Sequence, residues 1–267
     1  VSETADILID NGMPIGTNPV IEVTCREEPV CPTAGVANIS AFWLFACELV
    51  AACTRLEKTL AMYESGGMPG GGARNNAYQD VMFHEDLMAP SVAPGVLANQ
   101  FLSEMTRCFT GLSTQYPRFF QGGMLMARSL ESGHRVWISG NAHHFSAQDG
   151  MPGDPGLFSL NLNDMDMAAA VDAFQSEDTF AYMGYFSYPE PFVKATRQAG
   201  MSSVWLQGGC EYRYFINRPQ EILIDCGWKH GDACIDLPGY DILIIPPSGV
   251  VQTAALWMLV GEAASHM

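Results

Sequence analysis

The residues best suited to chemistry in this 267-residue sequence follow short apolar runs that are typical of buried strands. His143 and His144 come directly after the run His134–Asn141. Histidine titrates near neutral pH, so this pair is the candidate for catalytic proton transfer or for contact with a ligand. The alternative is that both are loop histidines that bond to the backbone. Metal binding needs three or more converging ligands, and no His-x-x-x-His or similar spacing predicts a metal site.

A second set of candidates consists of small polar residues at the ends of apolar runs. These candidate ligand-binding residues are Ser139, Gly140, Asn141, Ser146, Ser187 and Ser248. Hydroxyls and glycine N–H groups at strand ends and helix starts can donate hydrogen bonds to a ligand. Ser248 also fits as the N-cap of the last helix, where it would contribute about 1 kcal/mol. Neither a G-x-x-x-x-G-K-[ST] loop nor a G-x-S-x-G elbow is present.

The sequence contains the same strand–loop–helix unit twice, and such a unit would position these residues. ADILIDNGMPIG near the start matches PQEILIDCGWKHG near the end, with Asp10 aligned with Asp225 and Gly12 with Gly227. In each copy a second block follows, and its residues match at a shift of 214. The matched pairs in that block include Gly35 and Gly249, Trp43 and Trp257, and Glu48 and Glu262. A glutamate shared by both copies favours a packing or interface role over a catalytic one.

Each copy predicts the same elements. ILID is expected to be a short buried strand that ends in a turn, followed by a second extended run and a long apolar helix that begins near Thr33 or Ser248. Residues 1–64 hold only this last strand and helix, so their apolar faces must be covered elsewhere. They could complete a separately encoded or cleaved first half, dock on the second domain, or swap between protomers.

The rest of the chain predicts an α/β domain. Apolar strands are expected at His134–Asn141, Leu157–Asn163, Asp178–Phe186, Ser202–Gly208 and Glu221–Asp225, and helices at Leu97–Leu112, Arg118–Ser132 and Pro189–Gly200. Strands that lack alternation and are separated by helices indicate a parallel sheet covered on both faces. The Gly-rich stretch Glu64–Arg74 favours a flexible loop, so we expect a linker over 65–95 and a complete domain over 96–267.

Composition narrows the function classes. The chain has 13 Lys and Arg against 29 Asp and Glu, a net charge of −16, which argues against binding to nucleic acid or to an anionic membrane surface. Eight cysteines without a C-x-x-C pair, and no secretory signal, predict reduced thiols in the cytoplasm. The longest apolar helical run, Ile39–Ala52, is interrupted by Glu48 and is expected to be too short to span a bilayer.

Several motifs together resemble the SIS (sugar isomerase) family of phosphosugar-binding domains. The first is ISGNAHHFSA, a strand that ends in a small-residue loop, and the second is AYMGYFSYPEPFVKATRQAGMSSVWLQG. The closing block, EILIDCGWKHGDACI followed by PPSGVVQTAALWMLVGE, is similar to the phosphoheptose-isomerase-like and uncharacterised SIS branch. The resemblance covers roughly Val96–Met267, with Val1–Leu60 as the tail of a preceding copy.

The resemblance implies a flavodoxin-like three-layer α-β-α sandwich with a five-stranded parallel sheet. It also implies a site for a sugar phosphate or another sugar derivative, without a cofactor, where a carboxylate or histidine moves protons for aldose–ketose isomerisation. The chain departs from the family in that its second loop keeps one hydroxyl, Ser187, next to the acidic Glu190. The alternative is therefore a non-catalytic, degenerate module with a structural or regulatory role in an oligomer. Expected partners are further copies of the chain or a separate chain that completes the first SIS copy.

Overall fold

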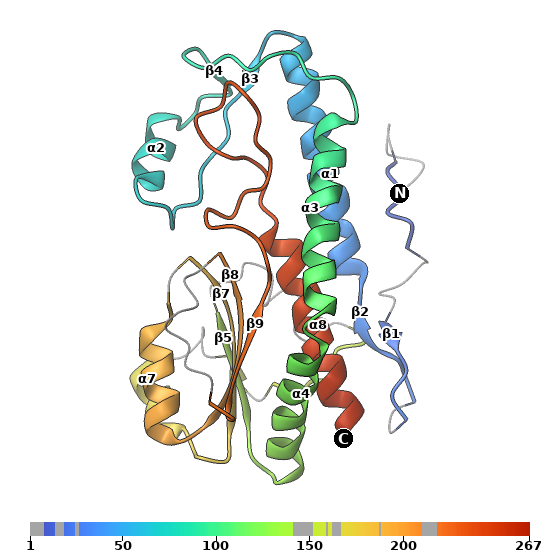
Figure 1. The fold of residues 1–267 in the computed structure, drawn as a ribbon, viewed down its shortest axis with the longest axis vertical. Coiled ribbons are helices and arrows are strands. Elements are labelled where there is room, and N and C mark those ends of the chain that lie inside the picture. The colour runs from blue at the N-terminus through green and yellow to red at the C-terminus, as the bar shows by residue number, and fades with distance from the viewer. Residues whose placement is uncertain are drawn as a thin grey trace.

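The structure, a computed structural model, consists of a parallel sheet between helices and a smaller lobe around residues 59–84. The lobe lies beyond the carboxyl ends of the strands (Figure 1). It describes residues 8–13, 19–24, 27–140, 152–158, 160–161, 167–186, 188–209 and 218–267. The helices are α1 (Ala34–Arg55), α2 (Gly71–Ala77), α3 (Val96–Ser113), α4 (Tyr116–Glu131), α6 (Met167–Ala173), α7 (Glu190–Ala199) and α8 (Ser248–His266). The strands are β1 (Pro19–Ile21), β2 (Val30–Pro32), β3 (Thr59–Leu60), β4 (Phe83–His84), β5 (Val136–Gly140), β6 (Leu160–Asn161), β7 (Thr179–Tyr185), β8 (Ser202–Gly208) and β9 (Glu221–Asp225).

The main sheet has the strand order β6-β5-β7-β8-β9, and all of its strand pairs are parallel. Renumbered within the sheet, this order is 2-1-3-4-5, which is the flavodoxin-like arrangement. Each of the five strands lies inside one of the runs expected from sequence, and the edge strand β6 is only two residues long. The prediction of a parallel α/β fold is confirmed.

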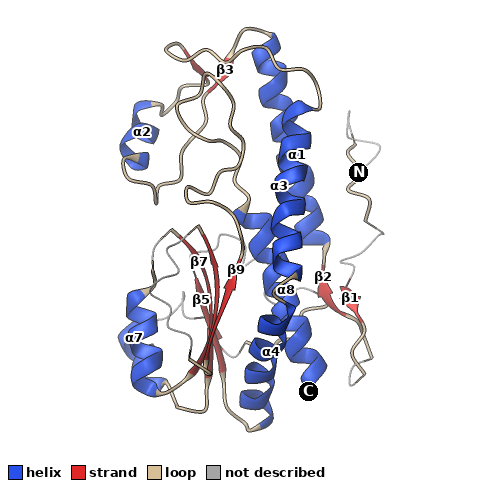
Figure 2. Cartoon of the chain, viewed as in Figure 1, coloured by secondary structure: helices blue, strands red, loops and turns tan. Residues whose placement is uncertain are grey.

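Side chains alternate between the two faces of the sheet, and helices cover both faces (Figure 2). On one face the strand residues Ile138, Ala181 and Val204 join the core under α4 and α8. On the other face the aromatic residues Trp137 and Trp205 join a second core under α6 and α7. Because both faces are buried, the strands read as continuous apolar runs in the sequence.

The N-terminal helix α1 packs against α3 and α8. Glu48 accepts a hydrogen bond from the Gly95 N–H group at 2.9 Å, and Arg55 donates one to the Val92 carbonyl at 2.9 Å. Glu48 therefore ties α1 to the start of α3, which is a packing role. The helix α1 begins at Ala34, as expected from Thr33, and its 22 residues extend beyond the apolar run Ile39–Ala52 at both ends.

By length and composition α1 could also cross a membrane, which corrects the expectation that this run is too short. Its most apolar 18-residue window has a mean hydropathy of 1.7, and 17% of that window is buried. Within the residues that the structure describes, α1 is the helix that meets these criteria.

The first ILID run departs from expectation, because its described residues 8–10 belong to no strand. A strand needs a neighbour that bonds to its backbone. The matching run in the second copy, β9, has β8 as that neighbour. The run after it does form an antiparallel hairpin, in which Pro19 pairs with Pro32 and Ile21 with Val30.

Asp178 is a buried carboxylate at the amino edge of the sheet. It accepts hydrogen bonds from the Trp137 indole at 2.8 Å, from the Arg135 N–H group at 2.9 Å and from the Gln175 N–H group at 3.1 Å. Only 1% of Asp178 is exposed. This carboxylate therefore joins β5 to β7 and to the turn after α6.

We predict that Asp178→Ala destabilises the fold by about 3–5 kcal/mol, because it leaves several buried donors without an acceptor. Urea denaturation measures the free energy of unfolding. The matched control is Asp172→Ala on the exposed side of α6, which should change that free energy by less than about 0.5 kcal/mol. A loss below about 1 kcal/mol for Asp178→Ala would contradict the assignment.

Candidate functional site

A cavity of about 580 Å³ opens at the carboxyl edge of the sheet, between the sheet domain and the smaller lobe. Its lining comes from both ends of the sequence: Trp43, Met62–Ser65, Met68, His230–Ala233, Leu243–Pro246, Ser248 and Gly249. In parallel α/β sheets, ligands bind outside the carboxyl ends of the strands. The position of this cavity makes it the candidate site.

The innermost polar contact at the cavity joins Asp232 to Ser248. One carboxylate oxygen of Asp232 accepts the Ser248 N–H group at 3.1 Å, and the other accepts the Ser248 hydroxyl at 2.8 Å. Asp232 is 8% exposed and Ser248 is 3% exposed. The carboxylate therefore caps the positive end of the α8 dipole. The burial of Asp232 at the start of a helix was not predicted from the sequence.

The backbone around the cavity is strained at three non-glycine residues. Phe186, Asp232 and Ile245 have φ angles of 68°, 46° and 63°, in the left-handed region that side chains with a Cβ rarely adopt. Each lies at a loop that borders the carboxyl edge of the sheet. Residues held in such conformations cluster at functional sites, because the surrounding structure must impose them.

The Gly-rich segment lies over this edge, and close contacts explain two of its glycines. A Cβ on Gly67 would meet the Phe186 ring at 2.7 Å, and a Cβ on Gly71 would meet the Ser65 carbonyl oxygen at 2.4 Å. Glycine is thus required for close approach at both positions. Within the region expected as a linker, residues 71–77 form α2 and residues 83–84 form β4. The division of the chain into domains stays a prediction.

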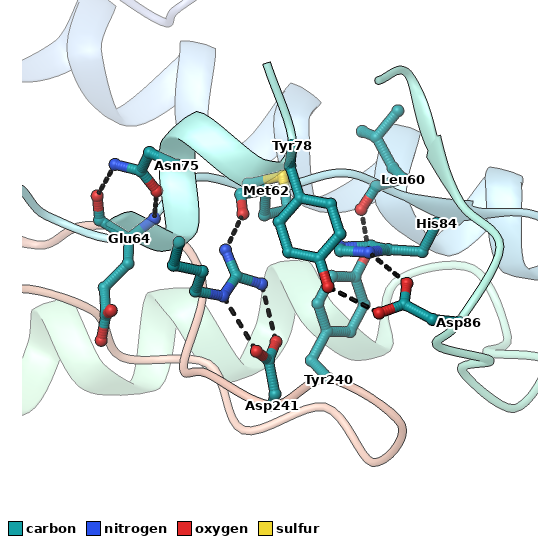
Figure 3. A network of polar contacts seen from close by, with 10 residues as sticks. Leu60, Met62, Glu64, Asn75, Tyr78, His84, Asp86, Tyr240 and Asp241 are labelled. Carbon is teal, nitrogen blue, oxygen red and sulfur yellow. Dashed lines mark hydrogen bonds and ion pairs between the residues drawn. The ribbon is translucent and has the colours of Figure 1, made fainter. Parts of the chain in front are cut away.

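A network of polar contacts holds this segment in place (Figure 3). The Asn75 side chain accepts the Glu64 N–H group at 2.9 Å and donates to the Glu64 carbonyl at 2.7 Å. Arg74 donates to the Met62 carbonyl at 2.7 Å and to both oxygens of Asp241 at 2.9 and 2.6 Å. Glu64 is thereby fixed from both sides of its backbone at the wall of the cavity.

The same network contains His84, whose contacts resemble a proton relay. Its Nδ1 lies 3.3 Å from Asp86, which also accepts the Tyr78 hydroxyl at 2.7 Å. The His84 side chain is fully buried, and His84 does not line the cavity. Nearby, Tyr240 donates to the Leu60 carbonyl at 2.7 Å. These contacts therefore position the lobe and do not form a reactive centre at the cavity.

His230 and Glu64 are titratable residues that line the cavity, and the contacts of His230 define the roles of its ring nitrogens. Its Nδ1 lies 2.8 Å from the Gly209 carbonyl oxygen, and its ring meets the edge of Phe186 with 5.5 Å between centroids. A carbonyl only accepts hydrogen bonds, so Nδ1 carries the proton. In the neutral ring Nε2 is then an acceptor, as a general base requires.

Tyr185 cannot serve as a second base. Burial, followed by the charge of Asp232, raises the pKa of its phenol to about 12. The group therefore stays protonated at neutral pH. Among the described residues, no group of three or more His, Cys, Asp or Glu side chains could hold a metal ion.

The structure places some of the predicted site residues. Ser139 and Gly140 end β5 and pair with Tyr182 and Met183 of β7. Ser248 begins α8 and lines the cavity. The predicted residues His143, His144, Asn141, Ser146 and Ser187 lie outside the described residues. Their roles stay predictions.

Sequence reasoning missed Glu64 and His230. Glu64 stands in a Gly-rich segment that is typical of linkers, and the close approach of Gly67 to Phe186 brings this segment to the sheet. His230 belongs to the strand-to-turn block that occurs twice. Its place at the carboxyl end of a predicted strand was the available signal.

None of the described cysteines is in a disulfide bond: Cys31, Cys47, Cys53, Cys108, Cys226 and Cys234. Burial raises the pKa of Cys31 and of Cys47 to about 12, so both stay protonated and act as small apolar side chains.

We predict that Asp232→Ala destabilises the fold by about 2–3 kcal/mol, because the N–H group and the hydroxyl of Ser248 lose their acceptor in a buried place. Asp232→Asn keeps an acceptor and should cost less. Thermal or urea unfolding checks both, with the exposed Asp236→Ala as control. Equal effects of Asp232→Ala and Asp236→Ala would show that Asp232 does not cap α8.

We predict a pH-dependent loosening of the lobe through Asp241. The hydrogen bonds from Arg74 hold the pKa of this carboxyl below its usual range. A lowered folded pKa means that the stabilisation is complete above the unfolded pKa, about 3.9, and is lost as the pH falls through the folded pKa. Asp241→Asn should imitate that loss at pH 7 and speed amide hydrogen exchange over residues 62–75. The exposed Asp236→Asn should leave it unchanged, and equal protection in both variants would contradict the prediction.

No protein-family model matches the sequence, and no curated protein matches it. The structure is similar to phosphoheptose isomerase GmhA from Neisseria gonorrhoeae, with 11% identity and a TM-score of 0.43, over 61% of this chain and 94% of that chain. It is also similar to the C-terminal domain of glucosamine-fructose-6-phosphate aminotransferase from Francisella tularensis, with 10% identity and a TM-score of 0.40, over 65% of this chain and 46% of that chain. Both neighbours have the SIS fold. At these identities and TM-scores, neither structure bears on the chemistry of this chain.

Proposed function

We propose that the cavity beside Asp232 binds a sugar derivative and that the chain is an SIS-type binding domain. The observation that carries this proposal is the place of the cavity. It opens at the carboxyl edge of a parallel sheet with strand order 2-1-3-4-5, where open α/β sheets bind small molecules.

The lining of the cavity suits a polyhydroxylated ligand. Trp43 and Met68 offer apolar surface, on which the C–H face of a sugar ring can pack. Glu64 and Asp232 offer carboxylate oxygens that accept hydrogen bonds from sugar hydroxyls. A few polar groups that converge on a largely apolar wall are typical of small-molecule sites.

The charge of the lining favours a ligand without phosphate. Among the described residues, Glu64 and Asp232 line the cavity and no lysine or arginine does. The α8 amide that a phosphate would use is already bonded to Asp232. A phosphate in this cavity would therefore meet like charge, and none of the described lining residues is a lysine or arginine that could offset it. We expect a neutral sugar or an amino sugar.

Isomerisation is the reaction that such a site can catalyse. Aldose–ketose exchange needs one base that takes a proton from one carbon and returns it to the adjacent carbon. His230, with its accepting Nε2, supports this role among the described residues. His143 and His144, which the sequence predicted, stay candidates for the same step.

A non-catalytic role in assembly is the second candidate. Ser248 directs both its N–H group and its hydroxyl to Asp232, so these two donors are already committed. Measurable isomerase turnover that disappears in His230→Ala, or in the double variant His143→Ala and His144→Ala, would rule this candidate out.

We predict that a neutral or amino sugar stabilises the chain and that its 6-phosphate does so less. A ligand at ten times its Kd contributes about 1.4 kcal/mol, which raises the melting temperature by about 3–5 °C in a domain of this size. Thermal shift with glucose, glucosamine and N-acetylglucosamine beside their 6-phosphates measures this.

Two variants locate the effect. Glu64→Gln should weaken the stabilisation because it removes a carboxylate from the cavity wall, whereas Glu131→Gln, at the exposed end of α4, should not. A shift that is unchanged in Glu64→Gln would place binding elsewhere. No shift with any sugar at 10–20 mM, about ten times a millimolar Kd, would contradict the proposal.

A further inference from the structure

The helix α1 exposes one apolar face to solvent. Phe42, Phe45 and Leu49 are 59%, 52% and 44% exposed, whereas Cys47 and Val50 on the packed side are buried. Two phenylalanines and a leucine on one helix face form an apolar patch of the kind that marks interaction surfaces. The sequence repeat indicates what covers it.

The two copies of the repeat share local geometry as well as sequence. The Gly12 N–H group donates to the Asp10 side chain at 2.8 Å, and the Gly227 N–H group donates to the Asp225 side chain at 2.7 Å. Both glycines have positive φ angles, 73° and 84°. The same turn thus follows the ILID run in each copy, although only the second run is a strand.

The starts of helices α1 and α8 also share their backbone geometry. Cys31 and Ile245, which match at the shift of 214 residues, are non-glycine residues with φ angles of 67° and 63°. The helices α1 and α8 begin at Ala34 and Ser248, which match at that shift too. The correspondence between α1 and α8 therefore holds residue by residue in three dimensions.

The counterparts of the exposed α1 residues are buried in α8. The matched pairs are Phe42 with Leu256, Phe45 with Leu259, and Leu49 with Ala263. Leu256 is 1% exposed, and Leu259 and Ala263 are fully buried. The face that α1 presents to solvent is thus the face that α8 buries.

What covers this face of α8 is the sheet together with α4. Leu259 and Val204 of β8 both lie against Gly122 of α4, where an added Cβ would approach them to 3.0 and 3.2 Å. Gln252, the counterpart of Asn38, donates to the Gly184 carbonyl of β7 at 2.9 Å. The face of the sheet and a glycine-bearing helix therefore cover this face of α8.

The N-terminal segment beside α1 also exposes apolar side chains. Leu8 and Ile9 are 67% and 56% exposed, whereas their counterparts Leu223 and Ile224 lie in β9 beside β8. Asn11 donates a hydrogen bond to Asn38 of α1 at 2.6 Å, and residues 8–11 line a cavity of about 500 Å³ together with Phe42 and Phe45. The run at residues 8–10 and the exposed face of α1 thus lack the neighbours that β9 and α8 have.

We propose that this open face binds a second α/β body of the same architecture, one that lacks its own last strand and last helix. That body would place a β8-like strand beside residues 8–10 and a sheet with an α4-like helix against Phe42, Phe45 and Leu49. The helix α1 would then lie between two α/β bodies, since its other side packs on α3 and α8.

A second copy of this chain does not fit this role. Its sheet and α4 are already covered by its own α8. Two α1 faces that met directly would bring no strand beside residues 8–10, so they would not supply the neighbour that β8 gives to β9.

Photo-cross-linking tests the proposal with the full chain in its native host. Phe45→p-benzoylphenylalanine places the reactive group on the open face, and Phe120→p-benzoylphenylalanine on the exposed side of α4 is the matched control. We expect an adduct from position 45 alone, with the cross-linked peptide mapping to a parallel strand or an adjacent helix of an α/β body other than residues 96–267 of this chain.

A second variant separates docking from folding. Phe45→Asp should reduce the recovered complex by at least about tenfold. It should leave the melting temperature of the free chain unchanged, because the side chain is already exposed, whereas Leu259→Asp should unfold it. An adduct to a second copy of this chain, an adduct to lipid, no adduct, equal adducts from position 120, or unfolding of Phe45→Asp would each overturn the proposal.

Discussion

The carboxylate of Asp232, buried at the start of α8, is the contact on which the shape of the cavity depends. It joins the turn after β9 to the first residue of the last helix, and it holds its own backbone at a positive φ angle to do so. Because the carboxylate lies at the positive end of a 19-residue helix, the helix dipole favours the contact. The proposed preference for a ligand without phosphate rests on the same carboxylate.

The opposite wall of the cavity comes from a distant part of the sequence. Glu64 belongs to the segment that follows β3, and Asn75 and Arg74 anchor that segment to itself and to the loop at Asp241. The cavity therefore exists only when residues about 170 positions apart have met.

An element of this structure was predictable when its signal lies in the local sequence, and not when it depends on distant residues. The five strands were predictable because each one is an apolar run closed by turn residues. Ser248 was predictable as a helix start because Pro and Gly flank it. Glu64 was not, because its position depends on the close approach of Gly67 to Phe186, and a Gly-rich stretch looks like flexibility in a linear sequence. The burial of Asp232 was not predictable either, since its partner Ser248 lies 16 residues away and the loop between them has no periodicity.

Residues 8–10 are a case in which the local signal is present and the strand does not form. Its sequence is as strand-like as that of β9, and the turn after it has the same geometry, yet it forms no strand because no neighbour bonds to its backbone. A helix differs, because its backbone bonds are internal, and α1 forms fully while one face stays open. Local sequence thus determines a helix, whose backbone hydrogen bonds are internal. A strand also needs a partner strand that bonds to its backbone. The exposed face of α1 and the unpaired run before it are both explained if the missing neighbour is a single α/β body.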